Sequence, residues 1–428
     1  MLKKSTWPRA ITAGTLVLAA ATFLAACGGT ESASTGSGTT ASSGTSTSSG
    51  ATDLAALSAV VAKYKQAPTT IPISTPLKQA PAKGKTFVFL QCDVAQCTQL
   101  SKAFAAATAA IGWDLKVIPY KSANPATLIA GMEQALQYNP VAVGLTGIPG
   151  IAWQSEVPAY EKAGVPIVVG HVGPQAITST IIANIDNEES VQTTAKVLAD
   201  YFIVNSDGKG KILQFQVPDF PILGAFDQAF RADVQASCSG CSVTQLTGTI
   251  SEVTSGGSTA AIVSALQRHP EVTWLVTDNG PWVDGLPAAL AAAHLNVKII
   301  GGGADVTNET DIKAGTVTAF TGVALNYSAW AMVDAVLRHL EGTPIPASEG
   351  LLPLQLLVKD ENFAVSESYD EPADYAAQME KLWHVGPEPG AGRGRGDGAS
   401  PRPSGSRPHQ VLRGDGRPLG FRSGHRAR

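Results

Sequence analysis

Cysteines are the residues of this chain whose spacing most directly indicates chemistry, and the sequence contains five of them. Four form two close pairs, Cys92 with Cys97 and Cys238 with Cys241. The second pair has the spacing of a redox dithiol, but such a pair usually opens a helix that lowers the thiol pKa, and here the intervening Ser and Gly predict a turn into a strand. Zinc binding is also disfavoured, because the two pairs have different spacings.

The fifth cysteine, Cys27, closes an apolar run that follows three basic residues near the start of the chain. This run, residues 10–23, is shorter than the roughly 20 residues that a membrane-spanning helix needs, so it predicts an export signal. The segment Leu24–Cys27 resembles the lipobox of bacterial lipoproteins. The resemblance implies a signal peptide over 1–26, a lipid on the sulfur of Cys27, and a location at the outer face of the cytoplasmic membrane.

Two further expectations depend on this leader. Residues 27–52 are rich in Ser, Thr, Gly and Ala and predict a flexible tether, which disfavours the alternative that Cys27 ends a buried helix. Thiols outside the cytoplasm tend to be oxidised, so the sequence favours two local disulfides, Cys92–Cys97 and Cys238–Cys241. The redox and zinc alternatives stay open.

Composition bounds the class of protein. The 428 residues are 44% hydrophobic and 15% charged, which is typical of a globular chain. The net charge is −4, and much of the positive charge lies in an Arg-, Gly- and Pro-rich tail, 387–428. The composition of this tail predicts disorder. A second hypothesis is that the tail arises from a shifted reading frame and is absent from the native protein. The acidic body argues against nucleic-acid binding, which depends on Lys and Arg.

Strand and helix patterns alternate from Thr86 onward, after a helical pattern over 53–65 and an extended, Pro-spaced strap. Such alternation predicts parallel sheets with helices on both faces. Because the pattern runs through two similar rounds, we expect an α/β fold of two doubly wound parallel-sheet lobes. Ligands of such sheets bind beyond the carboxyl ends of the strands.

Several segments in a fixed order resemble the type I, ribose-binding-like periplasmic binding proteins, which are the solute-binding lipoproteins of ABC importers. These segments are AGVPIVV at 163–169, NIDNEES at 184–190, VTDNG at 276–280, VKIIGGG at 297–303 and IKAGTVTA at 312–319. The resemblance covers about 85–385 and implies a non-enzymatic binding protein without a cofactor or metal. It also implies a small-molecule ligand, a permease and a cytoplasmic ATPase as partners, and a monomer.

The resemblance implies three crossings of the chain between the lobes, near Ile185, Val323 and Pro346. We therefore expect the domain boundaries to follow these crossings. They are a helix and extended strap over 53–84, an N-terminal lobe over 85–185 with 324–345, and a C-terminal lobe over 186–323 with 346–386.

The chain departs from the relatives that hold sugars at five positions. His171 and Val172 stand where an Asp-Arg pair is common, Phe226 where an Arg often lies, Gly303 where an Asp often lies, and Val323 near a usual Gln. Together these replacements favour a neutral ligand that is less polar than a pentose.

The candidate ligand-binding residues follow the strands. Several have a structural alternative: a loop shaped by a disulfide for Gln91 and Asp93, a structural histidine for His171, helix caps for Asp278 and Asp305, and core packing for Phe226. Trp282 is less easily explained as core because it lies in a loop. The full set is Gln91, Asp93, His171, Asp186, Asn187, Phe220, Phe226, Asp278, Trp282, Asp305 and Asn326.

The common catalytic motifs of hydrolases, metalloproteases and phosphate-binding enzymes are absent from the sequence. A binding lipoprotein is therefore the first hypothesis. Alternatives are a ligand sensor that docks on a receptor kinase, an exported enzyme on the same fold, and a cytoplasmic repressor. The repressor is disfavoured because a leader and tether occupy the place of a DNA-binding domain.

Overall fold

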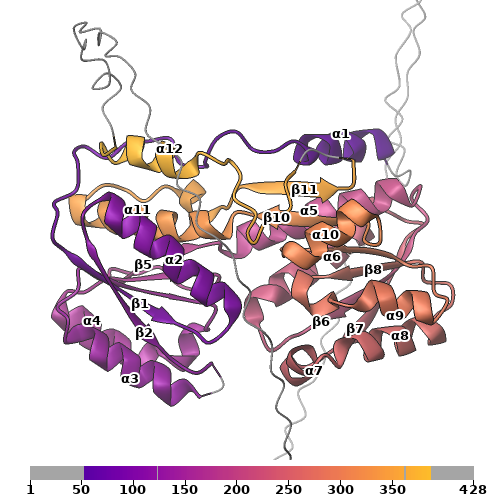
Figure 1. The fold of residues 1–428 in the computed structure, drawn as a ribbon, viewed down its shortest axis with the longest axis horizontal. Coiled ribbons are helices and arrows are strands. Elements are labelled where there is room, and N and C mark those ends of the chain that lie inside the picture. Colours follow the sequence, from indigo (N-terminus) through magenta and orange to yellow (C-terminus); the bar gives the residue numbers. More distant parts are fainter. Residues whose placement is uncertain (1–52, 123, 361–362, 387–428) are drawn as a thin grey trace, which may run out of the picture. The chain divides into compact units, whose positions relative to one another are not determined.

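The computed structural model describes residues 53–386 apart from 123 and 361–362 (Figure 1). The predicted signal peptide, the lipidation site Cys27, the tether and the Arg-rich tail lie outside the described residues. Within the described part of the chain, none of the helices is both long enough and apolar enough to cross a membrane.

A five-stranded sheet with order β2-β1-β3-β4-β5 forms the centre of the first lobe, and its strands are all parallel. Side chains of β1 alternate between two apolar clusters. Phe87 and Phe89 pack with Phe104 of a helix on one face, whereas Val88 and Leu90 belong to the cluster on the other face. The elements are β1 (Thr86–Gln91), α2 (Ala95–Ala110), β2 (Asp114–Pro119), α3 (Pro125–Leu136), β3 (Ala142–Thr146), η1 (Gly150–Ala152), η2 (Gln154–Glu156), α4 (Val157–Ala163), β4 (Ile167–Gly170) and β5 (Ile181–Ile185).

A six-stranded sheet with order β11-β10-β9-β8-β6-β7 forms the centre of the second lobe. Its strands are parallel except for β11, which pairs antiparallel with β10. The elements are α5 (Glu188–Asn205), β6 (Lys211–Gln216), α6 (Pro221–Ser237), β7 (Ser242–Thr247), α7 (Ile250–Ser255), α8 (Ser258–Arg268), β8 (Trp274–Thr277), η3 (Gly280–Val283), α9 (Leu286–Ala292), β9 (Lys298–Gly301), α10 (Val306–Ala314), β10 (Ala319–Val323) and β11 (Leu354–Val358).

The chain passes between the two sheets at three places. It leaves β5 for α5, leaves β10 for α11 (Leu325–Glu341), and returns through η4 (Ala347–Gly350) to β11. Helix α11 contacts α2, β4 and β5, so it belongs with the first sheet (Figure 1). The predicted fold class, two parallel-sheet lobes joined through several strands of chain, is confirmed.

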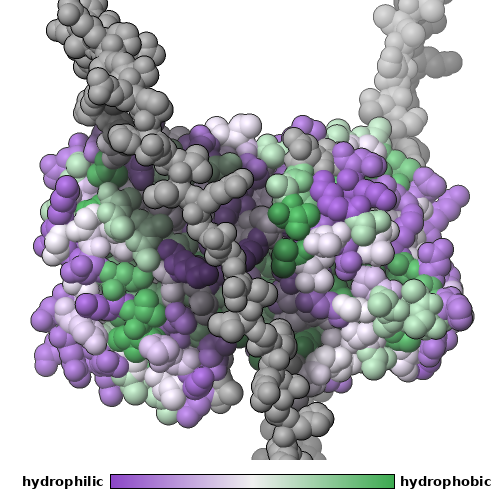
Figure 2. Space-filling model, viewed as in Figure 1, coloured by the Kyte–Doolittle hydropathy of each residue, from purple (hydrophilic) through white to green (hydrophobic). Residues whose placement is uncertain are grey.

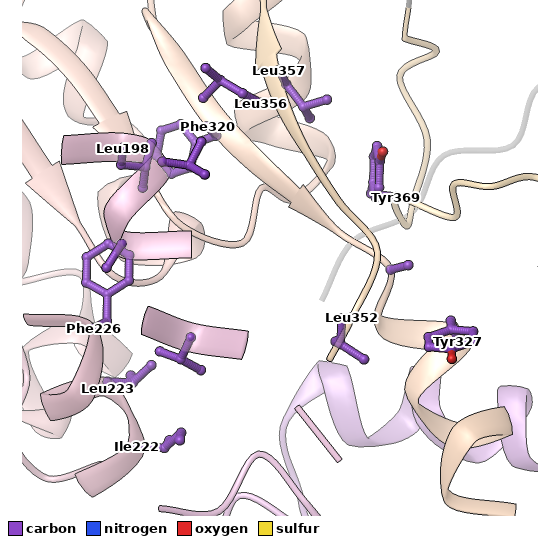
Figure 3. Packing of buried hydrophobic residues seen from close by; sticks show 14 of the residues in the cluster. Leu198, Ile222, Leu223, Phe226, Phe320, Tyr327, Leu352, Leu356, Leu357 and Tyr369 are labelled. Atoms are coloured by element: carbon purple, nitrogen blue, oxygen red, sulfur yellow. The ribbon is translucent and has the colours of Figure 1, made fainter. Parts of the chain in front are cut away.

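The core of the second lobe is continuous with the region of the crossings. Figure 3 shows Leu198 of α5, Phe226 of α6 and Phe320 of β10 within one buried cluster, together with Leu352 and Tyr327 close to the crossings. All five side chains are less than a tenth exposed. Burial of this apolar surface is the main stabilising contribution to the fold.

Helix α1 and the strap that follows it lie outside the alternating pattern and precede β1 in the chain. Helix α1 (Leu54–Lys65) begins at the capping residue Asp53 and contacts α5 and β11 of the second lobe. The strap, residues 66–85, then leads to β1 of the first lobe and lies along α12 (Tyr375–Leu382), where the amide of Leu77 donates to the carbonyl of Leu382 at 2.9 Å. The strap therefore links one lobe to the other in addition to the three crossings.

Candidate functional site

The carboxyl ends of the two sheets meet at one contact. The loop after β4 reaches the first turn of α6, and a Cβ placed on Gly173 would lie 3.0 Å from the Cα of Ile222. Both segments directly follow the carboxyl end of a parallel strand. In α/β sheets this is the edge at which ligands bind, so the contact marks a candidate cleft between the lobes.

A pocket of about 640 Å³ lies beside this contact, and its lining includes Pro221 of α6. The other lining residues come from the loops after β3 and β4, from α4 and from the first residue of β5, and they include Trp153, Gln154 and Gln175. None of the residues predicted from the sequence lines this pocket. Figure 2 shows hydrophilic and hydrophobic residues interspersed over both lobes on the face in view.

His171 and Asp186 form a pair at the carboxyl edge of the first sheet. Their strands β4 and β5 are neighbours with Gly170 opposite Ile185, and Nδ1 of His171 lies 2.7 Å from Oδ2 of Asp186. Both residues have positive φ, 54° and 52°. This left-handed backbone region is uncommon for residues other than glycine, and the surrounding structure must hold the backbone there. Burial lowers the pKa of His171, but the charge and hydrogen bond of Asp186 outweigh it, so the pKa lies above its ordinary value.

We expect the substitution Asp186→Asn to lower the pKa of His171, because it removes the charge that opposes burial. NMR titration of the imidazole Cε1 proton measures this change. Since the pKa is raised in the folded chain, the stabilisation from the pair is fully present below about pH 6.5 and is lost as the pH rises through the folded-state pKa. Asp93→Asn is the matched control. An unchanged His171 titration in Asp186→Asn would contradict the assignment.

Gln91 and Asp93 lie at the end of β1, next to the disulfide Cys92–Cys97. The hydroxyl of Ser101 donates to Oε1 of Gln91 at 2.5 Å, and the amide of Ser122 donates to Oδ1 of Asp93 at 3.1 Å. Hydrogen bonds from the backbone and the side chain of Ser122 lower the pKa of Asp93. Both side chains therefore already have partners within the first lobe.

Both predicted disulfides are present in the structure, with Cα–Cα distances of 5.5 Å for Cys92–Cys97 and 5.4 Å for Cys238–Cys241. The first lies beside the candidate cleft, between β1 and α2. The second joins the end of α6 to the start of β7. In the part of the chain that the structure describes, no group of three or more His, Cys, Asp or Glu side chains could hold a metal ion.

Aromatic residues of the second lobe lie after β6 and β8. Phe220 is half-buried and stacks on Trp282 with ring centroids 6.2 Å apart. Trp282 is only 9% exposed and lies edge-on to Phe215 of β6, so the interpretation of Trp282 as a loop residue outside the core is wrong. Phe226 is fully buried and stacks on Phe230, which makes it a core residue rather than a ligand contact.

Three predicted residues have structural roles at helix ends. The side chain of Asn187 caps α5 and its backbone N–H donates to the carbonyl of Gly350, while Asp305 caps α10 in a reciprocal arrangement with Asn308. Asn326 donates to Oδ2 of Asp370 at 2.9 Å. The side chains of these three residues therefore have hydrogen-bond partners within the protein, at helix ends and close to the crossings.

Asp278 differs from these residues because its carboxylate has no hydrogen-bond partner in the described part of the chain. It follows β8 and is 6% exposed. Its neighbour is Asp227 of α6, which accepts from Nε2 of Gln214 at 2.9 Å. Asp227 and Gln214 are not among the residues predicted from the sequence, although a glutamine within the apolar strand β6 is a signal of a buried polar contact.

Comparison with known proteins establishes the family. The model of the periplasmic binding protein domain matches residues 87–344. The chain belongs to this family. The resemblance in the sequence is therefore confirmed, and the family is one of binding proteins. No curated protein matches the chain.

Several solved structures share the fold at low identity. One is a sugar ABC transporter subunit from Rhodobacter sphaeroides 2.4.1, with a TM-score of 0.57, 16% identity, and coverage of 65% of this chain and 99% of that chain. A periplasmic ribose ABC transporter protein from Conexibacter woesei DSM 14684 has a TM-score of 0.55, 15% identity, and coverage of 66% and 94%. A putative LacI transcriptional regulator from Bacteroides fragilis has a TM-score of 0.56, 16% identity, and coverage of 65% and 98%.

Proposed function

We propose that this chain is the solute-binding component of a bacterial ABC importer, exported and held at the outer face of the cytoplasmic membrane by a lipid on Cys27. It captures a small molecule between its lobes and delivers it to a permease that a cytoplasmic ATPase drives. It acts as a monomer and catalyses no reaction.

The observation that carries this proposal is the contact between Gly173 and Ile222 at the carboxyl ends of the two sheets. A ligand in the cleft beside this contact touches both lobes, so it stabilises the closed arrangement over the open one. Closure also excludes water, which strengthens each hydrogen bond to the ligand. The His171–Asp186 pair and the exposed part of Phe220 are the proposed contacts from the first and second lobe.

Thermal-shift screening tests the proposal. A compound that binds only the folded chain raises the melting temperature, by mass action equivalent to about 2.7 kcal/mol at a ligand concentration of 100 Kd. The panel contains sugars, polyols, nucleosides and aromatic metabolites, and the sequence predicts a less polar compound than ribose as the hit. Turnover of the bound compound, or failure to acylate Cys27 in cells, would contradict the proposal.

Phe220→Ala is expected to weaken capture of the hit by about three- to tenfold, because stacked aromatic contacts contribute about 0.5–1.5 kcal/mol. Isothermal titration calorimetry measures the change. Tyr138→Ala, which removes an exposed ring beyond the end of α3, is the matched control and should bind normally. Equal affinities of the two variants would remove Phe220 from the site.

A further inference from the structure

The pocket beside Pro221 has an uncharged and mostly apolar lining. Its volume of about 640 Å³ is in the range of small-molecule sites, which is roughly 300–1,000 Å³. None of the lining residues carries a charge, and four of them are prolines: Pro149, Pro158, Pro174 and Pro221. An ion that entered this pocket would lose hydration without gaining a counter-charge, so the lining favours a neutral ligand.

The two most exposed large apolar side chains of the described residues lie at this pocket. Ile151, which lines it, is 79% exposed, and Ile177, which stands between the lining residues Ala176 and Thr178, is 54% exposed. Exposed apolar groups that gather at one place mark binding surfaces, whereas single ones need no explanation. The apolar surface of the pocket therefore extends along both of its loops.

The loops after β3 and β4 fix each other in place. A Cβ placed on Gly150 would lie 2.6 Å from Oε1 of Gln175, so the side chain of Gln175 lies against the start of η1. Trp153 is fully buried, and its Nε1 donates to the carbonyl of Ile148 at 3.1 Å. A pocket built from segments held in this way is largely preformed, which lowers the entropic cost of binding.

The polar groups of the lining are amides and one hydroxyl, from Gln154, Gln175 and Thr178. Nε2 of Gln175 donates to the carbonyl of Ala176 at 3.0 Å. The hydroxyl of Thr178 accepts from two backbone amides at 3.1 and 2.9 Å, which leaves its own proton to donate. These groups suit a ligand that has a few hydrogen-bonding atoms and no charge.

The pocket is continuous along the chain with the contacts proposed for both lobes, since Gly173 lies two residues after His171 and Pro221 directly follows Phe220. Building on the proposed function, we propose that the captured molecule places a neutral, apolar ring system in this pocket, with one or two hydroxyl or carbonyl groups for hydrogen bonds to the lining. The loops after β3 and β4, rather than the residues at the strand ends, then provide most of the contacts.

Probes that share one ring system and differ in charge test the inference. They are 2-naphthylmethanol, 2-naphthoate and 2-naphthylmethylammonium, and myo-inositol is the neutral but polar ring. Isothermal titration calorimetry on the full chain should show that the alcohol binds more tightly than each of the other three, by about tenfold or more. Absence of binding by the alcohol, or equal or tighter binding of an ion or of myo-inositol, would overturn the inference.

Two variants locate the binding of the alcohol. Ala176 lines the pocket and is exposed, so Ala176→Phe fills the pocket without displacing the core and should weaken binding by about tenfold or more. Ala106→Phe, at an exposed position of α2, is its matched control. Gln175→Ala removes a hydrogen-bonding amide and should weaken binding by about two- to tenfold, whereas Gln267→Ala, at an exposed position of α8, should not.

The inference and the proposed function fail through different observations. Unchanged affinity for the alcohol in Ala176→Phe would place it outside this pocket and overturn the inference. A sugar that raises the melting temperature in the wider screen, and binds Ala176→Phe as well as the parent chain, would support the proposed function while rejecting the apolar ligand. If no probe binds in the pocket, the inference is wrong and the exposed isoleucines are a contact surface for another protein.

Discussion

Replacing Arg338 with methionine is expected to lower the free energy of unfolding by about 3 to 5 kcal/mol, because it leaves buried acids without a counter-charge. Arg338 of α11 is 2% exposed, and its Nε lies 2.5 Å from Oδ2 of Asp334 and 3.4 Å from Oε2 of Glu349. Its Nη2 donates to the carbonyl of Thr75 in the strap at 2.7 Å. One side chain thus joins α11, the third crossing and the strap.

Chemical denaturation of Arg338→Met measures this effect. Arg268→Met removes an exposed arginine at the end of α8 and should change stability by no more than about 0.5 kcal/mol. Burial, and then the charge of Asp334, raise the pKa of Glu349 well above its ordinary value. A loss below about 1 kcal/mol in Arg338→Met would show that the cluster does not need its cation.

Trp383→Ala is expected to destabilise the chain by a similar amount, about 3 to 5 kcal/mol, through the loss of a large core side chain. Trp383 directly follows α12 and is fully buried. It stacks on Trp330 of α11 at 5.2 Å, and its Nε1 donates to Oδ1 of Asp334 at 2.6 Å. The segment after β11 is therefore an integral part of the fold, although it lies outside the region that matches the family model.

Trp383→Phe separates packing from hydrogen bonding, since it keeps a stacked ring and loses the donor to Asp334. We expect it to recover more than half of the loss seen in Trp383→Ala, as measured by denaturant unfolding. Equal losses in the two variants would indicate that the hydrogen bond, rather than the buried ring, dominates.

The sequence predicted strands well where apolar runs are short and bounded by turns. The alternating pattern expected from Thr86 onward begins in the structure with β1 at that residue, because a strand buried on both faces needs a continuous apolar run. Helix α10 was missed because its residues are mostly polar and show little apolar periodicity. Helix α12 was missed because it packs a few large residues at the end of an irregular, Pro-containing segment.

The candidate site was predictable in part. The sequence singled out His171 and Asp186 separately, and the order of strands in the sheet makes them neighbours, since each directly follows one of the paired strands β4 and β5. The electrostatic influence of Asp227 on Asp278 could not be predicted, because it depends on how α6 lies relative to the end of β8. Trp282 was misjudged because a short turn can place a ring in the core as firmly as a helix does.

The strap has a mechanical consequence for any motion of the lobes. Its ends are anchored on different lobes, where the carbonyl of Lys65 accepts from Nε2 of Gln355 in β11 and the amide of Gly84 donates to the carbonyl of Gly112 just before β2. Its middle is held by side chains of α11 and α12, including two amide hydrogen bonds to Glu341. Pulling the lobes straight apart would strip these bonds one after another, whereas a rotation whose axis lies near the strap leaves them intact. We therefore expect the two lobes to move by rotation about an axis near the strap rather than by translation relative to each other.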